Sequence, residues 1–113
     1  RVKLKVLDEW NERRSNIAAE YLKLLADNSK ITPPYVPEWA EPAWHLFVVR
    51  HPERDAFQQR LTEAGIGTMI HYPIPPHMQD AYADVKFTKN AFPIAEAIAK
   101  QALSLPIGPQ IKF

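Results

Sequence analysis

The segment from Gly67 to His77 constrains the fold of this chain more than any other part of the sequence. It reads GTMIHYPIPPH, so a short apolar run leads directly into three prolines within four positions. Proline fixes φ and lacks a backbone N–H, so this stretch is extended and cannot join the middle of a sheet. It therefore holds His71, Tyr72 and His77 in place. We interpret it either as the rim of a ligand site or as a rigid surface crossover with ordinary histidines.

The composition indicates one ordinary globular domain. The chain has 113 residues, of which 46% are apolar and 24% charged, and its net charge is +1. So small a charge gives no general attraction to nucleic acid or to a membrane surface, and we expect neither as a partner. Cysteine is absent, which excludes disulfides and thiolate metal sites, and the lack of a signal peptide favours a cytoplasmic protein. Because the sequence opens inside an amphipathic pattern without a starting methionine, we expect it to be part of a longer reading frame.

Residues 4–27 have the periodicity of a long helix. Apolar side chains recur there at three- and four-residue steps, which predicts one buried face, at Leu7, Trp10, Ile17 and Tyr21. Arg14 lies on the same stripe, where an unpaired charge is costly to bury. We expect its side chain to extend past Trp10 to solvent or to meet a carboxylate. In the alternative interpretation, Asn11 and Arg14 face another domain or subunit.

The rest of the sequence alternates short strands and helices. We predict strands over residues 44–50, 68–72 and 103–105, the last as an edge strand, and helices that begin near Asp55, His77 and Pro93. Asp55 and Gln58 predict a capping box, and Gly65 predicts the left-handed end of the same helix. The elements together predict an α/β (α+β) fold, with a small mixed or antiparallel sheet of about three strands packed against helices.

The polar residues form no motif that defines a reaction. His45 interrupts an apolar strand, either as a core histidine bonded to a carbonyl or as part of a site. The histidines have no HxxxH or HExxH spacing, so we expect no metal, and there is no glycine-rich phosphate loop. Ser104 lies in an apolar strand rather than at an exposed elbow, which gives no support to a serine triad. The residues alone predict a small domain with a histidine and tyrosine rim.

Four blocks of the sequence are more specific together than any one of them. They are residues 7–14 (LDEWNERR), 43–49 (AWHLFVV), 65–79 (GIGTMIHYPIPPHMQ), and 92–96 (FPIAE) with 103–106 (LSLP). In this order they resemble the carboxy-terminal part of the DegT/StrS family of nucleotide-sugar aminotransferases. The resemblance implies the small domain of a fold type I enzyme. Such enzymes use pyridoxal phosphate (PLP), form homodimers, and transfer an amino group, commonly from glutamate, to a keto group of a nucleotide-linked sugar.

The same resemblance implies which residues serve which purpose. The expected substrate-binding residues, at the sugar-nucleotide pocket, are His71, Tyr72, His77 and His45. Residues 1–28 correspond to a long linking helix and residues 43–106 to an α/β core within one small domain, 1–113. In the family, the PLP-binding large domain, with the lysine that holds PLP, lies upstream. No lysine here matches that position, so we expect no catalytic, cofactor-binding or metal-binding residue, and no activity from this part alone.

Two other classes of function stay open. A few members of the family act as PLP-dependent sugar dehydratases or as regulators instead of aminotransferases. The residues are also compatible with a free-standing binding or structural module.

Overall fold

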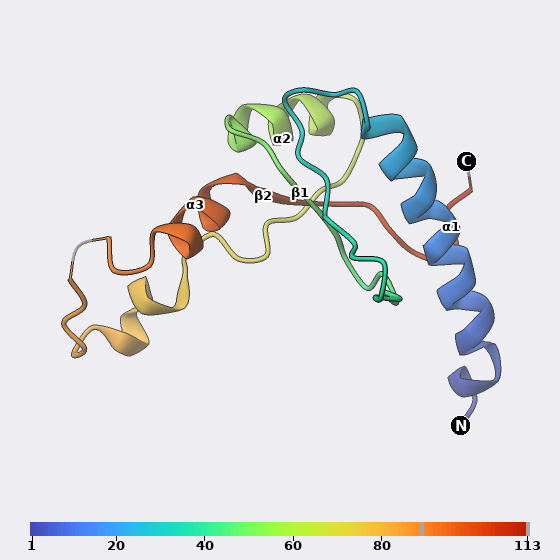
Figure 1. Cartoon of the computed structure of the whole chain (residues 1–113), viewed down its shortest axis with the longest axis horizontal. Helices are drawn as coiled ribbons and strands as arrows, with labels where there is room; N and C mark the ends of the chain where they lie inside the picture. Colours follow the sequence, from blue (N-terminus) through green and yellow to red (C-terminus); the bar gives the residue numbers. More distant parts are fainter. Residues whose placement is uncertain (89, 113) are drawn as a thin grey trace.

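The computed structural model describes residues 1–88 and 90–112 and has an elongated shape (Figure 1). Its helices are η1 (Lys3–Val6), α1 (Leu7–Leu25), α2 (Arg54–Glu63), η2 (Pro76–Met78), η3 (Asp80–Tyr82) and α3 (Pro93–Gln101), where η marks a short 3-10 helix. The long α1 lies at one end of the molecule, and α3 with the two later 3-10 helices lies at the other (Figure 1). The predicted helices are thus present, although the one near His77 is split into two short 3-10 turns. No helix in the described part of the chain is long and apolar enough to cross a membrane.

The sheet between the two ends has two antiparallel strands, β1 (Phe47–Arg50) and β2 (Ala102–Leu105). A single bridge joins Met69 to Ser104 on the other side of β2, with backbone N–H···O distances of 3.2 and 2.8 Å. The α/β class is confirmed, but the strand predicted over 68–72 is reduced to this one bridge, because the prolines that follow cannot extend a hydrogen-bonded ladder. In this two-stranded sheet β2 is at the edge, as predicted, and the single bridge to Met69 lies along its outer side.

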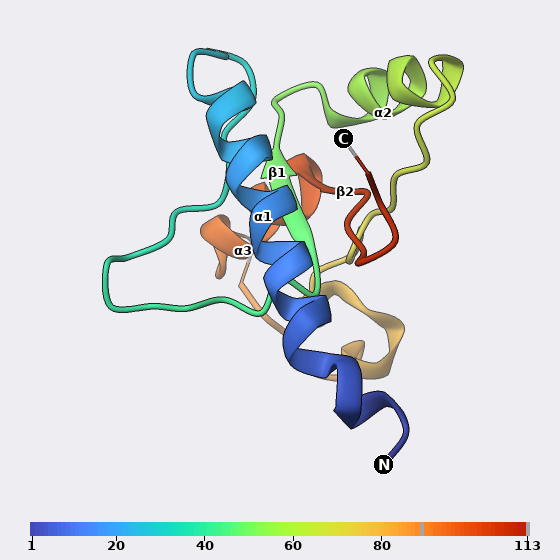
Figure 2. The same cartoon turned by 90° about the vertical axis from the view of Figure 1, so that its right-hand side faces the viewer.

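The core lies where α1 crosses one face of the sheet (Figure 2). Its buried residues are Ala18, Ile31, Phe47, Val49 and Leu103. The Tyr21 ring of α1 packs 4.8 Å from the Phe47 ring, and the Tyr21 hydroxyl donates a hydrogen bond of 2.9 Å to the carbonyl oxygen of Pro106. Side chains alternate along a strand, so Ser104, next to Leu103, points away from α1. The Ser104 side chain is therefore on the face of the sheet opposite α1.

The strand predicted over 44–50 begins later, at Phe47. Trp44 has a left-handed backbone with φ of 50°, which interrupts the extended run before β1. As a result, Trp44 is half-buried beside Phe47, and His45 is exposed instead of lying on a buried strand. The histidine in the core is His51, which is 3% exposed and accepts a hydrogen bond at Nδ1 from the backbone N–H of Glu53.

The two ends of α2 differ in how well local signals predicted them. The capping box of Asp55 and Gln58 is absent, because α2 already begins at Arg54 and has no side-chain cap. The other end is confirmed: Gly65 has φ of 77°. There the N–H groups of Ile66 and Gly65 bond to the carbonyls of Leu61 and Thr62, at 2.8 and 2.9 Å, which is the Schellman arrangement.

Arg14 is half-buried on α1, and its Nε is buried without a hydrogen-bond partner in the described part of the chain. The expected carboxylate partner is therefore not found among those residues.

Candidate functional site

His71 is held on the face of the sheet opposite α1 by backbone and side-chain contacts. The bridge between Met69 and Ser104 fixes the chain two residues before it. Its ring nitrogen Nδ1 lies 2.9 Å from Oγ of Ser104, which is 4% exposed. His71 itself is half-buried, so the rest of its ring reaches the surface. Two segments 33 positions apart in the sequence thus define the orientation of this imidazole.

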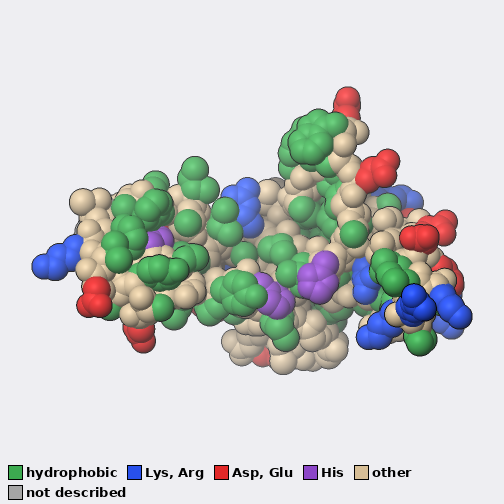
Figure 3. Space-filling view, turned by 90° about the horizontal axis from the view of Figure 1, so that it is seen from below, with side chains coloured by type: hydrophobic (Ala, Val, Ile, Leu, Met, Phe, Trp, Pro, Cys, Tyr) green, Lys and Arg blue, Asp and Glu red, His purple; other side chains and the backbone are tan. Residues whose placement is uncertain are grey.

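His71 and the exposed His45 line one cavity of about 330 Å³, together with Thr68 and Ser104. Thr68 is tied to α2, because Gln58 Nε2 donates a hydrogen bond of 3.4 Å to its hydroxyl. Figure 3 shows histidine side chains among hydrophobic side chains near the middle of the molecule. The structure therefore brings two of the four predicted site residues to the same cavity.

Tyr72 lies beside His71 but faces a second cavity. Its side chain is 74% exposed, and its ring meets the His71 ring edge-on at 5.7 Å between centroids. This cavity, of about 250 Å³, is lined by both of these residues, by Pro75 and by Ile98 of α3. His71 thus contributes to both cavities, and Tyr72 offers an exposed phenol at the edge of the second.

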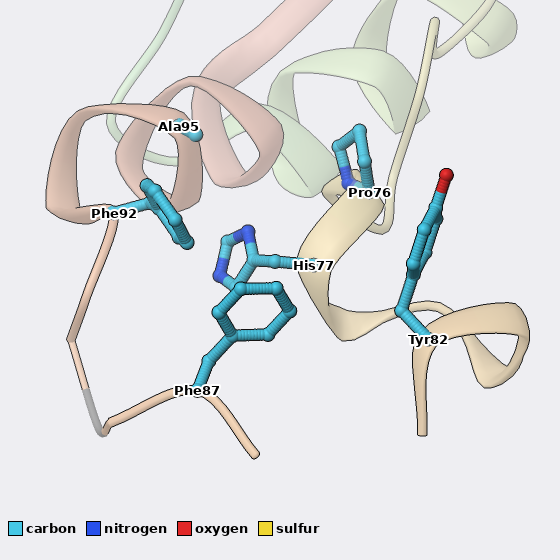
Figure 4. Close-up of a pocket in the computed structure, with 6 residues that line it drawn as sticks. All are labelled: Pro76, His77, Tyr82, Phe87, Phe92 and Ala95. Carbon is cyan, nitrogen blue, oxygen red and sulfur yellow. The ribbon is translucent and has the colours of Figure 1, made fainter. Parts of the chain in front are cut away.

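His77 lies in a different environment from the other three. It lines an apolar cavity of about 320 Å³, and its ring packs 4.8 Å from Phe92 and 6.0 Å from Phe87 (Figure 4). Its Nε2 is 3.2 Å from a carboxylate oxygen of Glu96, on α3. The cavity of His77 is not the one that His45 and His71 share. These contacts join the proline loop to α3. The His77 ring therefore supports the loop and is not exposed.

The groups at the His71 cavity can hydrogen bond to a polar ligand. No group of three histidine or acidic side chains in the described residues is arranged to hold a metal ion.

The sequence reasoning missed Ser104, the partner of His71, and Glu96, the partner of His77. A signal for the first was present, because Ser104 is a lone polar residue in the apolar strand from Ala102 to Leu105.

Comparisons with known proteins agree over nearly the whole chain. The profile of the DegT/DnrJ/EryC1/StrS aminotransferase family matches residues 1–112. The chain is 50% identical, over 98% of its length, to the erythromycin biosynthesis sensory transduction protein EryC1 of Saccharopolyspora erythraea. It is 46% identical, over 99% of its length, to the dTDP-3-amino-3,4,6-trideoxy-alpha-D-glucose transaminase of Streptomyces venezuelae. It spans only about 30% of the length of each of these relatives.

The solved structures give the same result. The chain superposes with a TM-score of 0.95 and 46% identity on S. venezuelae DesV, whose crystal structure is a complex with a ketimine intermediate. That superposition covers 99% of this chain and 30% of DesV. Both the family profile and the fold cover the helix α1, the sheet and the proline loop. The chain therefore belongs to the DegT/DnrJ/EryC1/StrS aminotransferase family.

Proposed function

We propose that this chain is the carboxy-terminal small domain of a PLP-dependent aminotransferase that acts on a nucleotide-linked keto sugar. The observation that carries this proposal is the family match over residues 1–112, supported by the superposition on DesV. When bound, PLP supplies the electron sink through which an amino group passes from a donor to the sugar. We include in the proposal a cytoplasmic homodimer, as the family resemblance implies.

In our proposal, this chain alone does not form the PLP site. PLP requires a lysine in a sheltered pocket, yet every lysine among residues 1–88 and 90–112 is exposed. None of them lines the cavity that His45 and His71 share. In our proposal the cofactor lysine therefore belongs to a part of the protein outside this sequence, and this chain contributes to the substrate side of the pocket.

Within that pocket we assign direct substrate contacts to His71, Tyr72 and His45. The half-buried His71 and the exposed Tyr72 and His45 offer hydrogen-bonding groups at open cavities, which suits a polar sugar nucleotide. We assign His77 an indirect role, because its ring is packed between phenylalanines and bonded to Glu96. It would keep the proline loop against α3 and so support the position of Tyr72.

The test uses the full-length protein that carries this sequence, supplied with PLP, an amino donor and a dTDP-linked keto sugar. We expect an amino sugar by mass spectrometry. His71→Ala and Tyr72→Phe should each lower kcat/KM for the sugar by about ten- to hundred-fold, as when a hydrogen bond to a charged group is lost. The absorbance of bound PLP should not change.

The matched control is Tyr35→Phe, because Tyr35 is 87% exposed and lines none of the three cavities described above. It should leave the sugar kinetics unchanged. Wild-type kinetics in the His71 and Tyr72 variants would contradict the assigned contacts, and the absence of any amino sugar would contradict the aminotransferase proposal.

A regulatory function is the second candidate, because the 50% identical EryC1 is described as a sensory transduction protein. The same assay separates the two. A full-length protein that neither takes up PLP nor forms an amino sugar would favour this alternative.

A further inference from the structure

The hydrogen bond between His71 and Ser104 is built into a rigid part of the fold. Ser104 lies on β2, which is paired with β1 on one side and bridged to Met69 on the other. The bridge and the side-chain bond both join Ser104 to the same short segment, from Met69 to His71. The backbone pairing therefore fixes where the Ser104 side chain starts, and the side-chain bond of 2.9 Å orients the imidazole.

The position of the hydroxyl proton follows from what surrounds it. Ser104 is buried, and within the described part of the chain the only hydrogen-bond partner of its Oγ is Nδ1 of His71. A hydroxyl has one proton to donate, and a buried donor without an acceptor is costly. If Nδ1 carried the ring proton and donated it to Oγ, the hydroxyl proton would have no acceptor. The favoured arrangement is therefore Ser104 donating to an unprotonated Nδ1.

The consequence for the imidazole is a defined tautomer. A neutral histidine whose Nδ1 accepts a hydrogen bond carries its proton on Nε2. No described residue hydrogen bonds to Nε2 of His71, although the ring lines two open cavities. The Nε2–H group is then available to a ligand, to which it can donate a hydrogen bond but from which it cannot accept one.

We propose that Ser104 is a positioning residue that selects the tautomer of His71 with its proton on Nε2 when the ring is neutral, so that His71 donates a hydrogen bond to an oxygen atom of the bound ligand. The ligand class is one rich in acceptor oxygens, such as the phosphates, carbonyl and hydroxyls of a sugar nucleotide. This choice of ligand rests on the proposed function, whereas the tautomer does not.

The tautomer is tested first, in the chain of 113 residues labelled with ¹⁵N-histidine. At roughly pH 8, where an ordinary histidine is neutral, long-range ¹H–¹⁵N spectra distinguish protonated Nδ1 from protonated Nε2. Wild type should show His71 as the Nε2–H form alone. Ser104→Ala should show a mixture of tautomers, Ser104→Thr should restore the single form because it keeps the hydroxyl, and the exposed Ser15→Ala should change nothing.

A wild-type spectrum with protonated Nδ1, or Ser104→Ala with an unchanged single tautomer, would overturn the proposal. If Ser104→Ala does not fold, the wild-type and Ser104→Thr spectra decide the question.

The ligand is tested next, in the full-length protein. There Ser104→Ala should lower kcat/KM for the sugar about tenfold without changing the bound PLP, and Ser104→Thr should recover most of it.

The two proposals fail separately. A single Nε2–H tautomer in a protein that forms no amino sugar would support the role of Ser104 and refute the aminotransferase. A mixture of tautomers in an active aminotransferase would support the aminotransferase and refute the role of Ser104.

Discussion

At the scale of single residues, the four histidines show how far environment separates side chains of one type. His51 is buried, with its ring stacked 4.8 Å from that of Phe57. His71 is bonded to a buried serine, His77 is packed among aromatic rings, and His45 is exposed. Of the four, His45 and His71 line one of the cavities described above together. Their common chemistry therefore does not give them a common role.

Tyr21 gives a prediction about pH at the same scale. Burial raises the pKa of its hydroxyl above the ordinary 10.0, so the unfolded chain loses this proton first as the pH rises. The stability that Tyr21 contributes is then fully present below about pH 10 and is lost as the pH passes through its raised pKa. Its bond to the Pro106 carbonyl should be worth about 1 kcal/mol.

Tyr21→Phe should accordingly lower the free energy of unfolding by about 1 kcal/mol at about pH 8, and by less at about pH 11. Urea denaturation of both proteins at the two values measures this difference, and the subtraction removes the effect of the other tyrosines. A difference that is the same at both pH values would contradict the effect of burial on this group.

At the scale of elements, Arg54 connects the start of α2 to the end of α3. It is 9% exposed, and its Nη1 donates hydrogen bonds of 3.1 and 3.2 Å to the carbonyls of Ala99 and Ala102. These carbonyls lie in the last turn of α3 and at its C-cap, where helical partners are missing and a positive charge is favourable. The arginine therefore stabilises the junction between α3 and β2, which in turn positions Ser104.

Arg54→Met should lower the free energy of unfolding by about 2 kcal/mol, because it removes charge-assisted hydrogen bonds and leaves buried carbonyls without partners. Chemical denaturation measures the change. The control is Asp55→Asn, since the Asp55 side chain is 86% exposed and its ion pair with Arg54 should contribute little. Equal effects of the two substitutions would show that the ion pair, and not the contact with α3, is what matters.

At the scale of the whole molecule, the core is small for the length of the chain. The radius of gyration is 16.6 Å, whereas a compact domain of about 100 residues has about 13 Å. Several large apolar side chains are exposed, among them Val2 at 84% and Leu4 at 68%, next to α1. The molecule is thus extended, with α1 at one end and α3 at the other (Figure 1).

This surface should make the chain associate. Contiguous exposed apolar area is sticky in water, so we expect sedimentation velocity to show oligomers that grow with concentration, and a hydrophobic dye to bind. Leu4→Glu should reduce both signals, whereas Lys3→Glu, at an exposed neighbouring position, should not. A monomer at all concentrations with no dye binding would contradict this expectation.

Elements with local signals were predictable from the amino-acid sequence alone. The periodicity of residues 4–27 predicted α1, Gly65 predicted the end of α2, and Pro93 the start of α3, and all three are confirmed. Each depends on backbone preferences or on side chains within a few positions, which a single sequence displays directly.

Contacts between distant segments, in contrast, depend on how the whole chain folds. The bond from His71 to Ser104 spans 33 positions, that from His77 to Glu96 spans 19, and that from Arg54 to Ala102 spans 48. The strand predicted over 68–72 was missed for the same reason. Strand pairing depends on which segment reaches β2 and not on the apolar pattern alone. Such contacts form after loop closure brings the segments together, so no local pattern specifies them.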